Sequence, residues 1–151
     1  MREIKKLIFH CSATIEGQNI SAATIKRWHV RDRGWSDIGY HYVIGLDGKI
    51  EAGRPVARKG AHTKGENSTS IGICYIGGLS KNKRAKDTRT EAQKNALIKL
   101  IKTLKNIYPS ASLHGHKEFA NKACPCFDVQ KEYSEFQPEG YKVKSNDSKE
   151  S

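Results

Sequence analysis

The sequence contains a strongly apolar, β-type segment followed by a helix with a clear start signal. Residues 71–76 read Ile-Gly-Ile-Cys-Tyr-Ile and lie between Ser/Thr residues and a Gly-Gly pair, which is typical of a buried central strand. The sequence Thr90-Glu91-Ala92-Gln93 is a capping box and predicts the first turn of a helix. The apolar residues that follow form one helical stripe: Ala96, Leu97, Leu100, Ile101 and Leu104. Pro109 predicts the end of this helix.

Shorter segments predict the remaining elements. Residues 4–9 predict a strand that delivers His10 at its end, residues 40–50 predict a hairpin, and residues 111–114 predict a last short strand. Ser21 is the predicted N-cap of a helix that ends before Gly34. Because strands and helices interleave, we expect an α/β fold: a single domain with a central mixed β-sheet flanked by helices.

Length and composition limit the number of domains and the location of the chain. A chain of 151 residues suits one domain, which we expect to span residues 1–137, followed by a polar, disordered tail at 138–151. No apolar stretch approaches the roughly 20 residues that cross a bilayer, so no membrane insertion is expected. The charged N-terminus precedes a very short apolar run, which predicts synthesis in the cytoplasm without a Sec signal peptide. The four cysteines are then expected to be free thiols.

The net charge of +11 is unevenly distributed along the chain. The segment from Lys81 to Lys105 holds nine Lys/Arg residues against Asp87 and Glu91, a net charge of +7. Such a basic face attracts anionic partners, which include nucleic acids, anionic cell-wall polymers and acidic proteins. No aromatic residues are interleaved with these cations, so a base-stacking surface is not indicated.

Two imidazoles and one thiolate are available for a zinc site at one edge of the sheet. His10 ends the first predicted strand, and a cluster containing His116 and Cys124 follows the last one. A site with three protein ligands leaves the fourth position of zinc open to water, which is the arrangement of catalytic zinc. A closed structural site is the alternative from the residues alone, and it would use the local set His114, His116, Cys124 and Cys126.

Several motifs in fixed order resemble the type 2 N-acetylmuramoyl-L-alanine amidases, and within that family the T7-type phage lysozymes. The resemblance covers about residues 4–129. It rests on His10-Cys11-Ser12-Ala13-Thr14, Arg33-Gly34-Trp35-Ser36-Asp37-Ile38-Gly39-Tyr40-His41-Tyr42, Asp47-Gly48, Glu51-Ala52-Gly53-Arg54, Gly60-Ala61-His62, Asn67-Ser68 and Lys122-Ala123-Cys124-Pro125 with Phe127-Asp128. The resemblance implies that a zinc-activated water hydrolyses the amide between N-acetylmuramic acid and the L-alanine of the stem peptide of peptidoglycan.

The resemblance also assigns roles to individual residues. It implies that His10, His116 and Cys124 hold Zn²⁺ and that Tyr40 and Lys122 are the catalytic residues. Weaker expectations concern substrate contacts by Arg54, His62 and Asn67, for which loop hydrogen bonding is the alternative. His29 and His41 are assigned to structure, and His114 is outside the family pattern. Cys126 stands where the family more usually has Gly or Ser, and it could compete for zinc or oxidise against Cys124.

The resemblance leaves three roles open. The first is an endolysin of a phage or prophage, which acts on the cell wall after release from the cytoplasm. The second is an amidase that recycles muropeptides in the cytoplasm, and the third is a recognition module without activity that binds peptidoglycan. Recognition modules typically lack the metal-binding Cys, so Cys124 favours an enzyme. We expect the chain to be a monomer.

Overall fold

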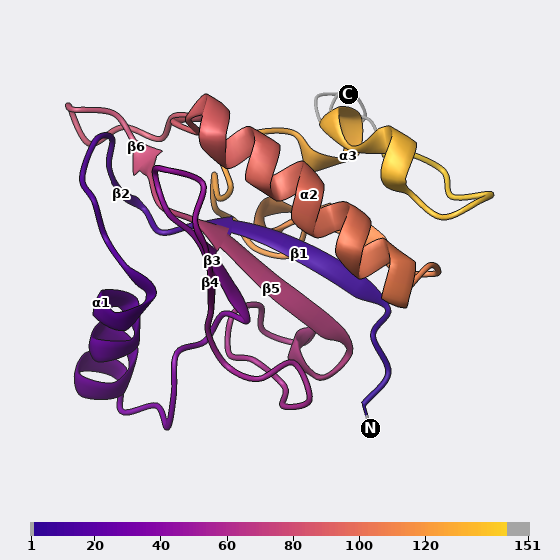
Figure 1. Cartoon of the computed structure of the whole chain (residues 1–151), viewed down its shortest axis with the longest axis horizontal. Helices are drawn as coiled ribbons and strands as arrows, with labels where there is room; N and C mark the ends of the chain where they lie inside the picture. Colours follow the sequence, from indigo (N-terminus) through magenta and orange to yellow (C-terminus); the bar gives the residue numbers. More distant parts are fainter. Residues whose placement is uncertain (1, 145–151) are drawn as a thin grey trace.

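The computed structural model describes residues 2–144 and has a five-stranded mixed sheet at its centre (Figure 1). The strand order is β4-β3-β5-β1-β7, and only β4 runs antiparallel to its neighbour. The strands are β1 (Lys6–Cys11), β3 (Tyr42–Ile44), β4 (Ile50–Ala52), β5 (Ser70–Tyr75) and β7 (Ser112–Gly115). A second, two-stranded sheet pairs β2 (Thr14–Ile15) with β6 (Gly78–Leu79). The expected α/β architecture with a buried central strand is confirmed, because β5 is the middle strand and is buried along its whole length.

The long helix α2 (Glu91–Ile107) lies across one face of the sheet, and its start is fixed by the predicted capping box (Figure 1). The Thr90 hydroxyl accepts from the amide of Gln93, while the Gln93 side chain accepts from the amide of Thr90. The Gln93 amide group also donates to the carbonyls of Ile44 and Ile76, at the ends of β3 and β5. The capped end of α2 is therefore joined to the carboxyl ends of two strands.

The side chains of β1 alternate between the two faces of the sheet, so that core residues and His10 lie on opposite faces. Leu7, Phe9 and Cys11 belong to the large core cluster that includes the buried stripe of α2. Because successive side chains of a strand point to opposite faces, Ile8 and His10 point away from α2. A smaller cluster contains Ile25 of α1 (Ala22–Arg27) together with neighbouring loop and strand residues.

The remaining helical segments are short. Helix α1 has the expected Ser21 cap and continues as a π-helical turn over Trp28–Asp32, which leaves Trp28 38% exposed although Ile25 is buried. Helix α3 (Val129–Glu132) follows the Asp128 N-cap, and 3₁₀ turns occupy Asn67–Thr69, His116–Glu118 and Ser134–Phe136. Within residues 2–144, no helix has both the length and the apolar character needed to cross a membrane.

Part of the segment expected to be a disordered tail packs against the domain. The ring of Tyr141 lies 6.1 Å from that of His114, and the amide of Lys144 donates to the side chain of Gln130. The boundary at residue 137 was expected because the segment that follows is polar, and it stays a prediction, although residues 138–144 make these two contacts with the domain. Residues 145–151, which were part of the same expectation, are outside the described residues.

Candidate metal centre

Three side chains from distant parts of the sequence meet at the carboxyl end of the sheet. The ligand atoms of His10, His116 and Cys124 all lie within 4.8 Å of one another. The parallel register pairs Phe9 of β1 with Gly115 of β7, so the residues that follow them, His10 and His116, are adjacent. Their ring centroids are 4.6 Å apart. Cys124 lies in the loop beyond the His116–Glu118 turn, and its sulphur is 3.9 Å from His10 Nδ1.

The Cys124 loop is fixed by hydrogen bonds from the core. The amide of Cys11 donates to the Cys124 sulphur at 3.2 Å, and the amide of Lys117 donates to the Cys124 carbonyl at 2.8 Å. The hydroxyl of Tyr75, at the end of β5, donates to the carbonyl of Pro125 at 2.7 Å. These bonds hold the sulphur in place against β1 and so preorganise the cluster.

The alternative closed site does not form among residues 2–144. Glu118 and Ser112 both hydrogen-bond the buried ring of His114, at 2.9 and 2.7 Å, so His114 is part of a structural network. The Cys126 sulphur donates to the carbonyl of Gly78 at 3.4 Å and lies 4.0 Å from the Cys11 sulphur. Neither His114 nor Cys126 belongs to the cluster of possible ligands.

The electrostatic surroundings favour neutral imidazoles at the centre. Burial lowers the pKa of His10 well below its usual value, and the neighbouring His62, His116 and Lys122 lower it further. Burial also lowers the pKa of His116, with an added contribution from Lys122. A neutral imidazole has the lone pair that a metal ligand requires.

Tyr40 and Lys122 border the cluster. The Tyr40 ring is 5.1 Å from that of His10, and burial, together with nearby Cys74 and Cys124, raises the pKa of the phenol well above its usual value. The phenol is therefore a hydrogen-bond donor at neutral pH. Lys122 is exposed, and its charge is near enough to both imidazoles to lower their pKa values.

Two pockets meet at His116 and Lys122. One has a volume of about 460 Å³ and includes Tyr40 and Cys124, together with Cys11, Ser12, Ala13, Trp28, His29, Asp32 and Arg33. The other, of about 410 Å³, includes Trp35, Ala61, His62, Thr63, Lys64, Asn67, Phe119 and Ala120. The two pockets therefore adjoin at His116, and Cys124 lines the first of them. Sequence reasoning gave no role to Phe119 or Thr63, since neither belongs to a motif quoted for the family.

The three residues expected to contact substrate differ in position. His62 and Asn67 line the second pocket, and Asn67 Oδ1 also accepts from the amides of His62 and Thr63. Arg54 is 8% exposed, and its guanidinium donates to three backbone carbonyls, those of Ile38, Lys59 and Asp37. The guanidinium of Arg54 therefore makes the loop hydrogen bonds of the alternative and lines neither pocket, and its contact with substrate stays a prediction.

The two histidines assigned to structure have structural partners. His29 Nδ1 accepts from the amide of Gly39 at 2.9 Å, although the residue also lines the first pocket. His41 Nδ1 accepts from the amide of Gly72 at 3.0 Å. The His29 imidazole thus supports the backbone just before Tyr40, and the His41 imidazole supports the backbone of β5.

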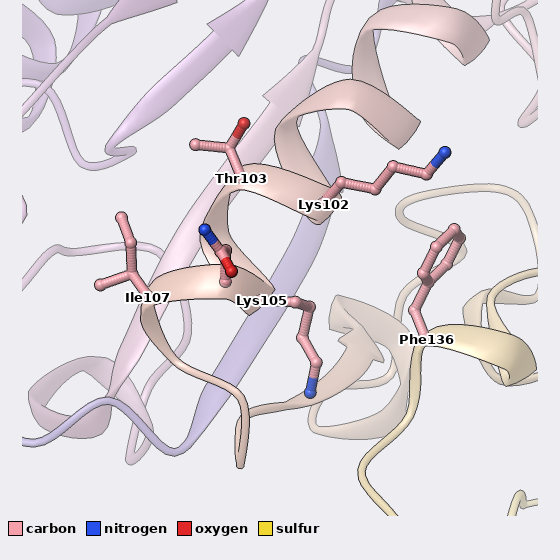
Figure 2. Close-up of a pocket in the computed structure, with 6 residues that line it drawn as sticks. Lys102, Thr103, Lys105, Ile107 and Phe136 are labelled. Atoms are coloured by element: carbon pink, nitrogen blue, oxygen red, sulfur yellow. The ribbon is translucent and has the colours of Figure 1, made fainter.

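Internal bonds occupy several cations of the basic segment 81–105. Lys86 pairs with Glu16, and the buried Arg89 pairs with Asp87 and Glu132. The Lys105 ammonium donates to the carbonyls of Pro109 and Ala111 beyond the end of α2. Lys102 and Lys105 line a pocket together with Phe136 (Figure 2). The pocket has a volume of about 690 Å³, and none of its lining residues borders the metal centre.

Fold and site together define a class: an α/β domain with a His-His-Cys cluster where the carboxyl ends of parallel strands meet, bordered by two adjoining pockets. The model of the N-acetylmuramoyl-L-alanine amidase family matches residues 1–127, and the chain belongs to this family.

Individual relatives agree with this assignment. The chain is 44% identical over 131 residues to an endolysin of Escherichia phage T7, which covers 86% of each chain. Among solved structures, the N-acetylmuramoyl-L-alanine amidase LysC from Clostridium intestinale URNW superposes with a TM-score of 0.73 at 29% identity, covering 89% of this chain and 83% of that one. Drosophila PGRP-LB superposes with a TM-score of 0.77 at 25% identity, covering 97% of this chain and 87% of that one.

Proposed function

We propose that the chain is a zinc-dependent N-acetylmuramoyl-L-alanine amidase that hydrolyses the bond between N-acetylmuramic acid and the L-alanine of the stem peptide. The observation that carries the proposal is the His10, His116 and Cys124 cluster at two adjoining pockets, in a chain of the amidase family. Its similarity to phage endolysins supports a role as a phage or prophage endolysin, which acts on the cell wall after release.

The donor set fits zinc. Two imidazole nitrogens and one thiolate are common zinc ligands, and three protein ligands leave one position for water or substrate. His10, His116 and Cys124 would hold the ion. When bound, zinc supplies a Lewis acid that polarises the substrate carbonyl and makes water a nucleophile at neutral pH.

The protein's own groups would handle charge and protons around the scissile amide. The Tyr40 phenol stays protonated because its pKa is raised, so it can donate a hydrogen bond to the oxyanion that develops at the carbonyl. The Lys122 ammonium, at the junction of the two pockets, would stabilise the same negative charge. In this proposal His62 and Asn67 contact the substrate from the second pocket.

We also propose an anionic partner for the basic face of the segment 81–105. The exposed cations Lys81, Lys83 and Arg84, with Lys99 and Lys102 of α2, give the basic face a charge that would attract an anionic polymer. We propose that the chain acts as a monomer, since each ligand and both catalytic candidates come from one chain.

Product analysis tests the proposed reaction. The purified chain should release new L-alanine amino termini from intact sacculi, detected by mass spectrometry, and a zinc chelator should abolish the release. Release of reducing sugar ends would instead indicate a glycosidase. Activity on soluble muropeptides but not on sacculi would favour a recycling enzyme over an endolysin.

A pair of cysteine variants tests the ligand set. Cys124→Ser should lose both zinc and activity, because the thiolate is a ligand in this proposal. Cys126→Ser is the matched control, two residues away in the same loop, and should keep one zinc per chain, measured by atomic emission, together with its activity. If Cys126→Ser were the inactive, zinc-free variant, the ligand assignment would be wrong.

A further inference from the structure

The two ring nitrogens of His10 have different surroundings. Nδ1 faces the cluster, 3.9 Å from the Cys124 sulphur, whereas Nε2 lies 2.9 Å from Nδ1 of His62. A metal-binding nitrogen must have a free lone pair, so Nδ1 can bind a metal only if the single proton of neutral His10 is on Nε2. The position of this proton depends on whether Nδ1 of His62 is a hydrogen-bond donor or an acceptor.

Ser70 decides which nitrogen of His62 carries a proton. The Ser70 hydroxyl oxygen lies 2.7 Å from the carbonyl of Glu66, and because a carbonyl can only accept, the hydroxyl must donate to it. The same oxygen lies 3.2 Å from Nε2 of His62, where it can then only accept. Neutral His62 therefore has its proton on Nε2 and a lone pair on Nδ1, which accepts from Nε2–H of His10.

Thr63 is compatible with this direction of hydrogen bonds. Its hydroxyl lies 3.0 Å from His62 Nδ1 and 3.3 Å from His10 Nε2. The hydroxyl can donate to Nδ1 of His62 and accept a hydrogen bond from Nε2–H of His10. Both contacts therefore agree with a proton on Nε2 in each imidazole.

The His62 ring is held firmly in this position. A Cβ atom on Gly72 of β5 would lie 2.6 Å from Cγ of His62, so the ring rests directly on the strand backbone where only glycine leaves room. The backbone amide of His62 donates to Asn67 at 2.9 Å. Tight packing of this kind keeps an orienting group in one position.

We infer that Ser70 and His62 are positioning residues that fix His10 as the Nε2–H tautomer and so direct its Nδ1 lone pair to the metal. The chain of hydrogen bonds runs from His10 to His62, from His62 to Ser70, and from Ser70 to the Glu66 carbonyl. The inference deepens the proposed function, because it concerns the same centre. It gives His62 a second role in addition to the proposed substrate contact, and it gives Ser70, which is fully buried, a role in the site.

The proton position can be measured without zinc or substrate. Two-bond ¹H–¹⁵N correlation spectra of the metal-free, ¹⁵N-labelled chain should show His10 and His62 with their protons on Nε2. A metal-free wild type in which His10 is protonated on Nδ1 would overturn the inference. This readout is independent of the proposed function, since it stands even if no amidase activity is found.

Variants test the consequence for metal binding. Ser70→Ala removes the acceptor for His62, so His10 should become a mixture of tautomers and the zinc affinity, measured by competition with a chromophoric chelator, should fall about 10-fold. Ser112→Ala is the matched control, because it deletes an analogous Ser–His hydrogen bond at His114, outside the cluster, and should leave zinc affinity unchanged. Equal affinities and unchanged tautomers in wild type and Ser70→Ala would refute the role of Ser70.

His62 itself allows a rescue experiment. Asn at position 62 can place an oxygen near the position of Nδ1 and accept from His10, whereas Leu of similar size cannot. His62→Asn should therefore retain the Nε2–H tautomer of His10 and more of the zinc affinity than His62→Leu. Equal loss in both variants would mean that packing alone, and not hydrogen bonding, explains the effect of His62.

Discussion

Replacing Tyr75 by Phe removes a single oxygen atom and tests how firmly the sheet holds the Cys124 loop. Tyr75 is 1% exposed, and its hydroxyl donates to the carbonyl of the buried Pro125 at 2.7 Å. Without this donor, water cannot hydrogen-bond the Pro125 carbonyl in its place, because Pro125 is buried. The residue after Cys124 then loses its direct bond to β5.

The size of the effect follows from the geometry of this bond. A typical hydrogen bond contributes about 0.5–1.5 kcal/mol net, and a buried acceptor left unsatisfied costs about 1–3 kcal/mol. The loss of one oxygen leaves almost no cavity, so the cavity contribution is small. We expect the free energy of unfolding to fall by about 1–3 kcal/mol, with the midpoint of thermal unfolding lower by about 2–4 °C per kcal/mol.

Urea denaturation of the metal-free protein measures this loss, and Tyr42→Phe provides a matched control. Tyr42 lies in the same sheet, is half-buried, and makes no side-chain hydrogen bond to another described residue. Tyr42→Phe should therefore change stability by less than about 0.5 kcal/mol. Zinc affinity should fall in Tyr75→Phe alone, because the bond positions the loop of a ligand. Equal stability and equal zinc affinity in the two variants would refute the reasoning.

Three further substitutions separate catalysis from stability. Lys122→Ala should keep zinc but lower kcat, and an unchanged rate would remove Lys122 from the mechanism. Arg54→Ala should lower the free energy of unfolding by about 2–4 kcal/mol, because three carbonyls lose their donor; unchanged stability with a raised KM would restore Arg54 as a substrate contact. Burial would raise the pKa of Glu118, but hydrogen bonds from His114, Gly115 and Gln130 outweigh it and leave that pKa below 4.5. The stability that Glu118 contributes is therefore present above pH 4.5 and lost as the pH falls through its lowered pKa, so urea titrations of wild type and Glu118→Gln should converge in acid.

Local signals predicted the elements whose stability is local. The capping box at Thr90 and Gln93 and the stripe on α2 appear in the structure as expected, because both depend on residues within a few positions. The buried run at 71–76 likewise predicted β5. The contact of Tyr141 with His114 could not be predicted from the polar composition after residue 137, because it depends on tertiary packing.

The site was less accessible to sequence reasoning. The preference for His116 over His114 and for Cys124 over Cys126 came from resemblance. In the structure the register between β1 and β7 places His116 beside His10, and the bond from the Cys11 amide places Cys124, and no local pattern encodes either contact. Substrate contact and loop hydrogen bonding were both open for Arg54, and the three loop carbonyls that its guanidinium reaches could not be read from local sequence. No sequence motif pointed to Ser70, since its role depends on its hydroxyl donating to the Glu66 carbonyl, a contact that only the folded structure shows.

The distance along the chain between the ligands has a consequence for when the site can exist. His10 and Cys124 are 114 residues apart and meet only in the folded domain, where β1 pairs with β7 and Cys11 and Tyr75 bond the Cys124 loop. During synthesis, a nascent chain therefore has no complete centre until Cys124 has left the ribosome and the sheet has closed. A metal bound there would tie the first strand to the last loop, so its dissociation should report opening of the whole domain rather than local fraying.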